Sequence, residues 1–415
     1  MKILLLNQVF YPDPVATAQH TRDLALYLVS HGHEVTVVAG NRGYEKRDQI
    51  FPSRESYQGV DVHRLASTGL GKRSILTRLF DAVTFDVNLA LKLLGLPRHD
   101  LVVSFTSPPL IGLFGTCFCM LKGGESVQWL MDVNPDAAIA VGYLKENGPV
   151  ATVLNRIFEF TLKRSGKIVV LDRWMRRRIV AHGAADSQMV VIPPWPVQAF
   201  SEENSANGDS FRAEHGLTGK FVVMYSGNHS IVHPLDTLLE AAVRLKDRDD
   251  VVFLFIGAGL RVHDVEEARA KHGLKNVMHL PSQPRERLHE SLAAANLHVV
   301  VMGNQMSGLV HVSKIYGALA SGQPYVFVGP RQSHVIDLIE ESGPGFHVDH
   351  GDVPGFVDVV DRVKGLSSAE LQRFAANRGY VARRYSMEKS LGIFLDEVVG
   401  SKAVGLSEAR MEMGR

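Results

Sequence analysis

The sequence predicts an α/β protein built from two doubly wound domains in series. Three observations predict this fold class: a length of 415 residues, a composition typical of folded proteins, and short apolar runs that alternate with helix-period segments. A single hydrophobic core rarely serves more than about 250 to 300 residues, so two cores are expected. Apolar residues make up 45% and charged residues 21%, which argues against disordered, collagen-like and disulfide-scaffold proteins.

The first half of the chain, residues 1–197, is predicted to form one domain. Its expected strands are KILLLN, EVTVVAG, VDVHRL, LVVSF, SVQWLM, KIVVL and MVVIP, and its expected helices span 16–30, 74–96, 110–121, 149–164 and 173–182. Short apolar strands that alternate with helices of this length are typical of a parallel sheet with helices on its faces.

The second half repeats the alternation after an interruption. A polar stretch that contains SEENSANGDS makes residues 198–219 a predicted linker or surface insertion. The strands KFVVMYSG, VVFLFIGAG, NVMHLP, LHVVVM, PYVFVG and GFHV then alternate with helices that begin near Pro234, Val262, Arg285, Ser313 and Val335. Residues 220–385 are therefore predicted to form a second Rossmann-like domain, with its ligand beyond the carboxyl ends of the strands.

The end of the chain has helical periodicity without a further strand. We predict that the helix within 386–400 caps the second sheet or crosses back to the first domain. Residues 401–415 are predicted to be a flexible tail.

Charge and cysteine usage narrow the function classes. The formal net charge is +1; residues 1–197 hold 22 basic and 17 acidic residues, and the remainder holds 23 and 27. Nucleic acid binding needs a concentrated basic face, so no nucleic acid partner is expected. Cys117 and Cys119 lie in an apolar run and are interpreted as buried thiols in a reducing compartment.

Neither a signal peptide nor a membrane span is expected. The apolar run after Lys2 is too short for a signal peptide. The most apolar stretch, residues 101–120, is interrupted by two adjacent prolines and three hydroxyl residues. We therefore expect a cytoplasmic protein.

The most informative stretch is SGLVHVSKIYGALASGQPYVFVGP, residues 307–330. A glycine-containing loop runs from a strand into a helix that Ser313 can cap, and free N–H groups at a helix N-terminus bind phosphate. Lys314 adds a positive charge in the first turn. The alternative is an ordinary capped helix with a solvated lysine. The predicted diphosphate site comprises Gly308, Leu309, Val310, His311, Val312, Ser313 and Lys314.

A second loop, YSGNHSIVHPLDTLLEAA, follows a strand in the same way. Gly227 permits close backbone approach, and Asn228, His229 and His233 place polar side chains before a helix. Two such loops in one domain favour an anion site that includes these four residues, with a purely structural His233 as the alternative. The GAG at 257–259 is only a weak match to a dinucleotide fingerprint, and we interpret it as a tight turn.

Further site residues follow other strands. Ser282, Gln283 and Pro284 are placed to contact a nucleotide base, although a plain βα loop is the alternative. In the first half, Ala16 and Thr17 begin the first long helix, where small residues let a ligand approach. Asp132 follows a strand and is the predicted catalytic carboxylate; the nearby Asp136 can be only a helix cap.

A basic run, KRSGKIVVLDRWMRRRIVAHG, contains seven Lys and Arg residues. Together with the apolar segment RSILTRLFDAVTFDVNLALKLLGLPRH it favours contact with anionic lipid, where each basic residue is worth about 1 kcal/mol. A solvated helix face is the alternative. We therefore consider the inner face of the cell membrane as a peripheral partner.

The motifs, taken in order, resemble those of glycosyltransferase family 4 over nearly the whole chain. They are NQVFYPD with GHEVTVV, MDVNPD, YSGNHSIVHPLDTLLEAA, PSQPRE and SKIYGALASGQPYVFVGP. The resemblance is greatest to the bacterial branch that makes lipopolysaccharide, capsule and exopolysaccharide. It implies the GT-B fold, in which two Rossmann-like domains face a central cleft.

The resemblance also implies the reaction. A sugar is transferred from a nucleotide donor, here expected to be a UDP-hexose or UDP-N-acetylhexosamine, with retention of configuration and without a required metal or other cofactor. The donor is expected on the second domain and a lipid-linked or other saccharide acceptor on the first. The phosphate loop of the family matches Gly227 onward, its base-binding segment matches 282–284, and its diphosphate helix matches 308–314.

Some charges of the family pattern are absent, and this keeps other functions open. Leu309 and Gly317 stand where the family often has a pair of Glu residues. Asn228 and His233 stand where it has an Arg–Lys clamp, and Met131 stands where it has a His before the catalytic Asp. The alternatives are a non-catalytic GT-B scaffold of a polysaccharide assembly complex and a GT-B nucleotide-sugar epimerase.

Overall fold

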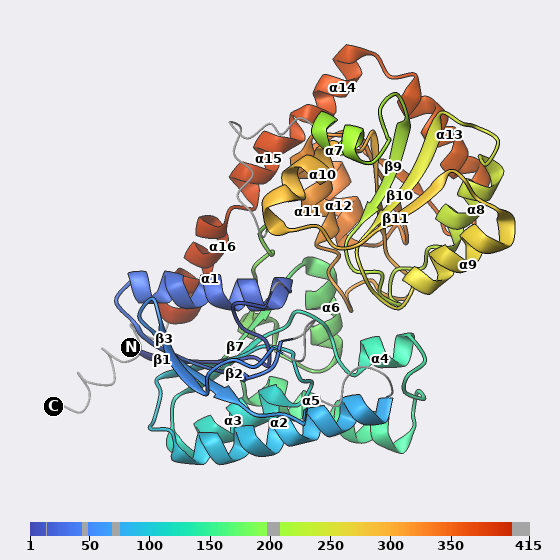
Figure 1. Cartoon of the computed structure of the whole chain (residues 1–415). Helices are drawn as coiled ribbons and strands as arrows, with labels where there is room; N and C mark the ends of the chain where they lie inside the picture. Colours follow the sequence, from blue (N-terminus) through green and yellow to red (C-terminus); the bar gives the residue numbers. More distant parts are fainter. Residues whose placement is uncertain (14, 44–48, 69–74, 197–207, 401–415) are drawn as a thin grey trace. The chain divides into compact units, whose positions relative to one another are not determined.

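The computed structural model describes residues 1–13, 15–43, 49–68, 75–196 and 208–400, and the chain divides into two compact units. The first unit comprises Met1–Val197, Gly308–Val310 and Met387–Arg415; the second comprises Gln198–Ser307 and His311–Ser386. Each unit contains one sheet between layers of helices (Figure 1). The prediction of two doubly wound α/β cores is confirmed.

The sheet of the first unit has eight strands in the order β3-β4-β2-β1-β5-β6-β7-β8. All neighbours are parallel except β3 and β4. The strands are β1 (Lys2–Leu6), β2 (Glu34–Gly40), β3 (Arg54–Tyr57), β4 (Val60–Leu65), β5 (Leu101–Ser104), β6 (Glu125–Trp129), β7 (Lys167–Val170) and β8 (Met189–Val191).

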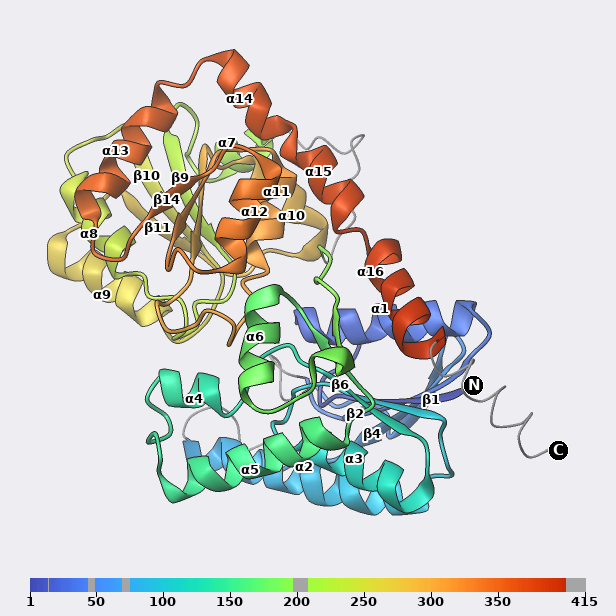
Figure 2. The ribbon, with the colours of Figure 1, turned by 180° about the vertical axis from the view of Figure 1, so that it is seen from behind.

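Helices cover both faces of this sheet, with α2, α3 and α5 on one face and α1 and α16 on the other (Figures 1 and 2). The helices are α1 (Ala16–Ser30), α2 (Ile75–Gly95), α3 (Ile111–Lys122), α4 (Asp136–Ala140), α5 (Pro149–Arg164), α6 (Arg173–Ala181), η1 (Asp186–Gln188), α16 (Met387–Phe394) and the π-helical turn η3 (Leu395–Gly400).

The last helix packs within the first unit. The ring of Phe394 on α16 stacks on Trp129 with a centroid distance of 5.2 Å. The Ser390 hydroxyl donates a hydrogen bond of 2.9 Å to the Pro193 carbonyl. The helix therefore belongs to the core of the unit that contains β6, although the bonded Ser390 and Pro193 are 197 residues apart in the sequence.

The sheet of the second unit has six parallel strands in the order β11-β10-β9-β12-β13-β14. They are β9 (Phe221–Ser226), β10 (Val251–Ile256), β11 (Val277–Leu280), β12 (Leu297–Val301), β13 (Tyr325–Val328) and β14 (Phe346–Val348). The helices are α7 (Asp209–Glu214), α8 (Asp236–Arg244), α9 (Val262–His272), η2 (Arg285–Arg287), α10 (Leu288–Ala293), α11 (Lys314–Ser321), α12 (His334–Ser342), α13 (Val353–Lys364), α14 (Ser368–Ala375) and α15 (Asn377–Arg384).

Burial explains why these segments are strands. Every residue of β12 is buried, and so is every residue of β13 and β5. A parallel sheet covered on both faces requires such uninterrupted apolar runs, which is the pattern read from the sequence. One core of the second unit joins the sheet to α8, α9 and α13, and another joins its opposite face to α7 and α10.

Three sequence predictions need correction. The predicted linker 198–219 contains α7, whose Phe211 is fully buried, so its described part is structural; residues 198–207 lie outside the described residues. The antiparallel strand β3 was not predicted, because RESY is short and polar. Helix α13, which lies between β14 and α14 in the sequence, was not predicted either. Residue 74 and the tail 401–415 also lie outside the described residues.

No helix in the described ranges is both long and apolar enough to span a membrane.

Candidate functional site

The second sheet reverses its strand order at β9, which lies between β10 and β12. Ligands of doubly wound sheets bind beyond the carboxyl ends of the strands at such a switch point. The loop after β9 begins at Gly227, and the loop after β12 leads to α11 at Lys314. Both predicted phosphate loops thus start where the topology favours a ligand.

The loop after β9 is held by the loop after β10. The His229 N–H donates to Ala258 O at 2.8 Å, and the Arg261 N–H donates to His229 O at 2.9 Å. A Cβ on Gly257 would lie 2.1 Å from Gly227 O, and one on Gly259 would lie 2.5 Å from His229 O. The two glycines of GAG are therefore needed for close packing of the two loops, in agreement with a tight turn.

Lys314 extends from the first residue of α11 across Gly227. A Cβ on Gly227 would lie 2.6 Å from Lys314 Cε, and Lys314 Nζ lies 5.5 Å from the centre of the Tyr225 ring. No ion pair or hydrogen bond of this ammonium group is found among the described residues. Burial lowers the pKa of Lys314 to about 7. The side chain thus places an amine with a lowered pKa, and with no counter-ion among the described residues, beside the glycine turn.

The predicted side-chain cap of α11 is wrong. Ser313 occupies the N-cap position, but its side chain accepts no capping hydrogen bond. The reason is its backbone, with φ −65° and ψ −16°, since a capping side chain requires an extended conformation at that residue. Backbone oxygens serve the first turn instead: the Ile315 N–H donates to Val312 O at 3.4 Å and the Tyr316 N–H donates to Ser313 O at 3.1 Å.

The two histidines of the loop are buried and neutral at pH 7. Burial, with the nearby His279, lowers the pKa of His229 to about 4, and within the described part of the chain neither of its ring nitrogens has a hydrogen-bond partner of acceptable geometry. Burial also lowers the pKa of His233 well below its usual range. The His233 Nδ1 lies 2.8 Å from Val301 O and donates to it. His233 therefore has a structural bond, whereas His229 retains hydrogen-bonding capacity.

Arg261 is a residue of this region that the sequence reasoning missed. Its Nη1 lies 2.9 Å from Asp264 and 3.7 Å from Asp236, and its Nε is buried without a partner. The only signal in the sequence is an arginine two residues after Gly259. Its main chain binds the Gly227 loop, so it is a second cation close to that loop.

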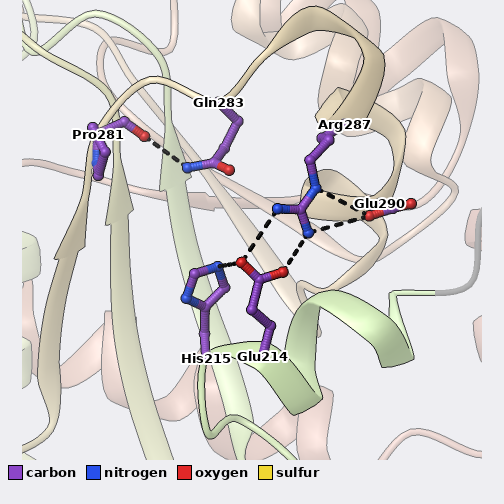
Figure 3. Close-up of polar contacts among 6 residues, drawn as sticks. All are labelled: Glu214, His215, Pro281, Gln283, Arg287 and Glu290. Carbon is purple, nitrogen blue, oxygen red and sulfur yellow. Dashed lines mark hydrogen bonds and ion pairs between the residues drawn. The ribbon is translucent and has the colours of Figure 1, made fainter.

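The predicted base-binding segment directly follows β11. Ser282 and Pro284 are exposed, and the Gln283 amide donates to Pro281 O at 2.9 Å. Beside this segment Arg287 binds Glu214 at 2.5 Å and Glu290 at 3.4 Å (Figure 3). These contacts join α7 to η2 and α10.

The predicted residues 308–312 are largely engaged within the protein, through their backbone as well as their side chains; the Val312 N–H, for example, donates to His334 Nε2 at 3.1 Å. Leu309, Val310 and Val312 are buried. The His311 ring stacks on His334 at 3.8 Å and binds the Tyr316 hydroxyl at 2.9 Å. Gly308–Val310 belong to the first unit, in which the Val133 N–H donates to Leu309 O at 2.8 Å and Asp132 forms a β-bridge with Val310.

Asp132 of the first unit lines a cavity of about 270 Å³ at the carboxyl ends of β5 and β6. Asn134 lines it as well, and most of the other lining side chains are apolar. Asp136 instead pairs with Arg178 at 2.8 Å and His182 at 3.1 Å. Burial opposes ionisation of Asp136, but these hydrogen bonds hold its pKa below its usual range. Asp136 is thus structural.

The other predicted residues of the first unit lie at the start of α1. Ala16 and Thr17 are half-buried, and no side chain caps this helix, whose N-cap residue is Val15. The structure therefore brings Gly227, His229, His233 and Lys314 together in the second unit. Asp132, Ala16 and Thr17 are positioned by separate strands of the first unit.

Two Rossmann-like units with loops gathered at the switch point of a parallel sheet define the GT-B class. The profile of the "Glycosyl transferase 4-like domain" matches residues 16–195, and that of "Glycosyl transferases group 1" matches residues 208–380. The chain therefore consists of a glycosyltransferase 4-like domain followed by a glycosyltransferase group 1 domain, and it is a glycosyltransferase.

Two curated relatives match this chain over most of their own length, and both are named as glycosyltransferases. The chain is 24% identical over 420 residues to "Putative colanic acid biosynthesis glycosyl transferase WcaI" of Escherichia coli K12, covering 96% of this chain and 100% of that protein. It is 24% identical over 335 residues to "Probable glycosyltransferase WbjE" of Pseudomonas aeruginosa, covering 80% of each.

Solved structures support the fold. HepE of Anabaena in complex with UDP-glucose superposes with a TM-score of 0.72 at 14% identity, covering 96% of this chain and 100% of that one. Sucrose-phosphate synthase of Thermosynechococcus elongatus gives 0.73 at 14% identity, covering 99% and 100%. At this identity the likeness concerns the fold.

Proposed function

We propose that this glycosyltransferase moves a sugar from a UDP-hexose or UDP-N-acetylhexosamine to a lipid-linked or other saccharide acceptor. The product would enter a cell-surface glycan such as lipopolysaccharide, capsule or exopolysaccharide. One observation supports the donor assignment: the stem of Lys314 crosses the glycine turn at a helix N-terminus, and its ammonium group has no counter-ion among the described residues. Names of the relatives and the UDP-glucose complex of HepE support the same assignment.

The residues of the chain suit a transfer with retention of configuration and without a required metal. The bond between the anomeric carbon and the diphosphate breaks, the acceptor oxygen bonds to that carbon on the same face, and the acceptor proton passes to the departing diphosphate oxygen. The charge that develops on the diphosphate is stabilised by Lys314 and the N-terminus of α11. Asp132 orients the acceptor or stabilises the cationic sugar.

A panel of nucleotides tests the donor assignment. Calorimetry with UDP, GDP, uridine, UDP-glucose and UDP-N-acetylglucosamine should give micromolar binding of a uridine diphosphate compound, unchanged by EDTA. A folded protein that binds none of them would contradict the proposal. An EDTA-dependent loss of turnover would contradict metal independence.

Donor consumption separates this function from its alternatives. A glycosyltransferase consumes donor faster when acceptor is present, an epimerase converts the donor alone, and a scaffold leaves the donor unchanged. Mass spectrometry of the nucleotide sugar after incubation with and without a membrane lipid extract distinguishes the three outcomes.

We also propose that the first unit binds the inner face of the membrane through α2, α3 and α5. Among the described residues, ten of the sixteen exposed large apolar side chains belong to these helices. Five form one stripe on α2 and are 50% to 64% exposed: Phe80, Val83, Val87, Leu91 and Leu94. Stripes of this kind bury in the interface of a bilayer.

The charges of these helices complement an anionic bilayer. Their segments hold six basic and three acidic residues, and two of the acidic residues, Asp81 and Asp86, are buried. Vesicles of phosphatidylglycerol should therefore retain the protein on sedimentation, and more weakly at high salt. Replacing Val87 and Leu91 by Glu should abolish retention, whereas Leu371→Glu on α14 should not. Equal retention of both variants would refute this surface.

A further inference from the structure

The cavity beside Asp132 has the layout of a binding site for an amphipathic molecule. Its wall is built from α3, α5 and the segments that follow β5 and β6, and includes Leu113, Leu154, Ile157 and Phe158. Asp132 and Asn134 line the same cavity.

The polar side chains deeper in the wall are already engaged. The Gln128 amide donates to Ser126 Oγ at 3.0 Å, and the Thr161 hydroxyl donates to Ile157 O at 2.8 Å. Because these side chains already have hydrogen-bond partners, few polar groups remain in that part of the wall to bind an ordered water molecule. Dry apolar cavities as small as about 150 Å³ bind hydrocarbons, and this cavity measures about 270 Å³.

Helix α5 connects the cavity with the proposed membrane surface. Leu154, Ile157 and Phe158 line the cavity, whereas Val150 and Val153 of the same helix are 57% and 54% exposed. Helix α3, which also lines the cavity, packs between α2 and α5. Apolar surface is thus present on both sides of one helical layer.

We propose that this cavity binds the hydrocarbon chain to which the acceptor saccharide is attached. With the chain against Leu154 and Ile157, the first sugar lies at Asp132, where its hydroxyl can be oriented for transfer. This assignment rests on the proposed function, because it names the part of the acceptor that the first unit recognises. In this assignment the hydrocarbon chain of the acceptor helps to determine which acceptor is used, independently of the donor site.

Titration calorimetry with two glucosides tests the proposal. Octyl β-glucoside, kept below its micelle concentration, should bind to the full-length protein, and methyl β-glucoside should not bind measurably. Leu154→Trp should fill part of the cavity. If the indole excludes two methylenes, each worth roughly a fourfold change in affinity, octyl β-glucoside should bind about fifteenfold more weakly.

Two further variants keep the test decisive. Leu371→Trp, at an exposed apolar position of α14 in the second unit, is the control and should bind octyl β-glucoside like the parent protein. Ala138→Trp, on another wall of the cavity, replaces Leu154→Trp if that variant does not fold. Farnesyl phosphate, titrated against the same variants, separates an isoprenoid chain from a straight alkyl chain.

Each outcome bears on the proposal. Loss of octyl glucoside binding in the cavity variants, with UDP affinity unchanged, supports it. Equal affinity in the parent, cavity variants and control, or no binding to the parent, overturns it and leaves a packing cavity. Failure of UDP binding in the parent would refute the donor assignment instead, so the two failures are distinguishable.

Discussion

Replacing Lys314 by Met should weaken binding of UDP-glucose and leave uridine binding unchanged. Methionine keeps most of the aliphatic stem that crosses Gly227 but removes the ammonium group. Losing a charge-assisted hydrogen bond costs about 1 to 3 kcal/mol of binding free energy. This loss corresponds to an increase in Kd of roughly 5-fold to 150-fold. Uridine lacks the diphosphate, so its affinity controls for a disturbed fold.

The pH dependence sharpens this prediction. Burial lowers the pKa of Lys314 to about 7 in the free protein. A bound diphosphate favours the charged form and raises that pKa, so binding above pH 7 must take up a proton. Affinity should be highest at and below pH 7 and should fall by up to about tenfold per pH unit above it, until the pH passes the pKa of the complex.

Calorimetry between pH 6 and 9 measures both effects. UDP-glucose is the suitable ligand because its diphosphate has no terminal phosphate that titrates in this range. The parent protein should lose affinity as the pH rises, whereas Lys314→Met should give a flat profile. His229, with a pKa of about 4, does not titrate in this window. Equal affinity of variant and parent at pH 7, or a pH slope retained in the variant, would refute the role of Lys314.

Three further predictions concern Gly227, Asp132 and His233. Gly227→Ala should weaken UDP-glucose binding about as much as Lys314→Met, because its Cβ would lie 2.6 Å from Lys314 Cε; unchanged calorimetric affinity would show that the lysine can move aside. Asp132→Asn should lower turnover by about tenfold or more with UDP affinity unchanged, as for a group that acts in the transition state; normal turnover would remove Asp132 from the catalytic site. His233→Phe should lower the free energy of unfolding by about 1 to 3 kcal/mol in urea titrations, because Val301 O loses its buried donor; an unchanged midpoint would argue against that bond.

The sheets were predictable because their strands are buried on both faces. Strands such as β12 and β13 are continuous apolar runs between helices, and no other element of this length gives that pattern. The hairpin strand β3 and helix α7 were missed because each is short and polar, and α7 is fixed mainly by the burial of Phe211.

The positions of the two predicted phosphate loops could be read from the sequence because glycines and polar residues follow strands at the switch point. The electrostatic properties of these loops could not be predicted in the same way, because the pKa of Lys314 and the neutral state of His229 depend on burial by segments that are distant in the sequence. Arg261 was missed because it contacts the Gly227 loop through its main chain. The apolar cavity depends on how α3 and α5 pack, which no local pattern encodes.

Sugar transfer itself is the most direct measurement. Purified protein is incubated with radiolabelled UDP-hexoses and UDP-N-acetylhexosamines and a bacterial lipid extract, and the organic phase is counted. We predict that one donor labels the lipid fraction in the presence of EDTA, and that Asp132→Asn labels that fraction about tenfold more slowly or less although it still binds UDP. A folded parent protein that binds no uridine diphosphate compound and labels no lipid would contradict the assignment of a UDP-sugar donor and a lipid-linked acceptor.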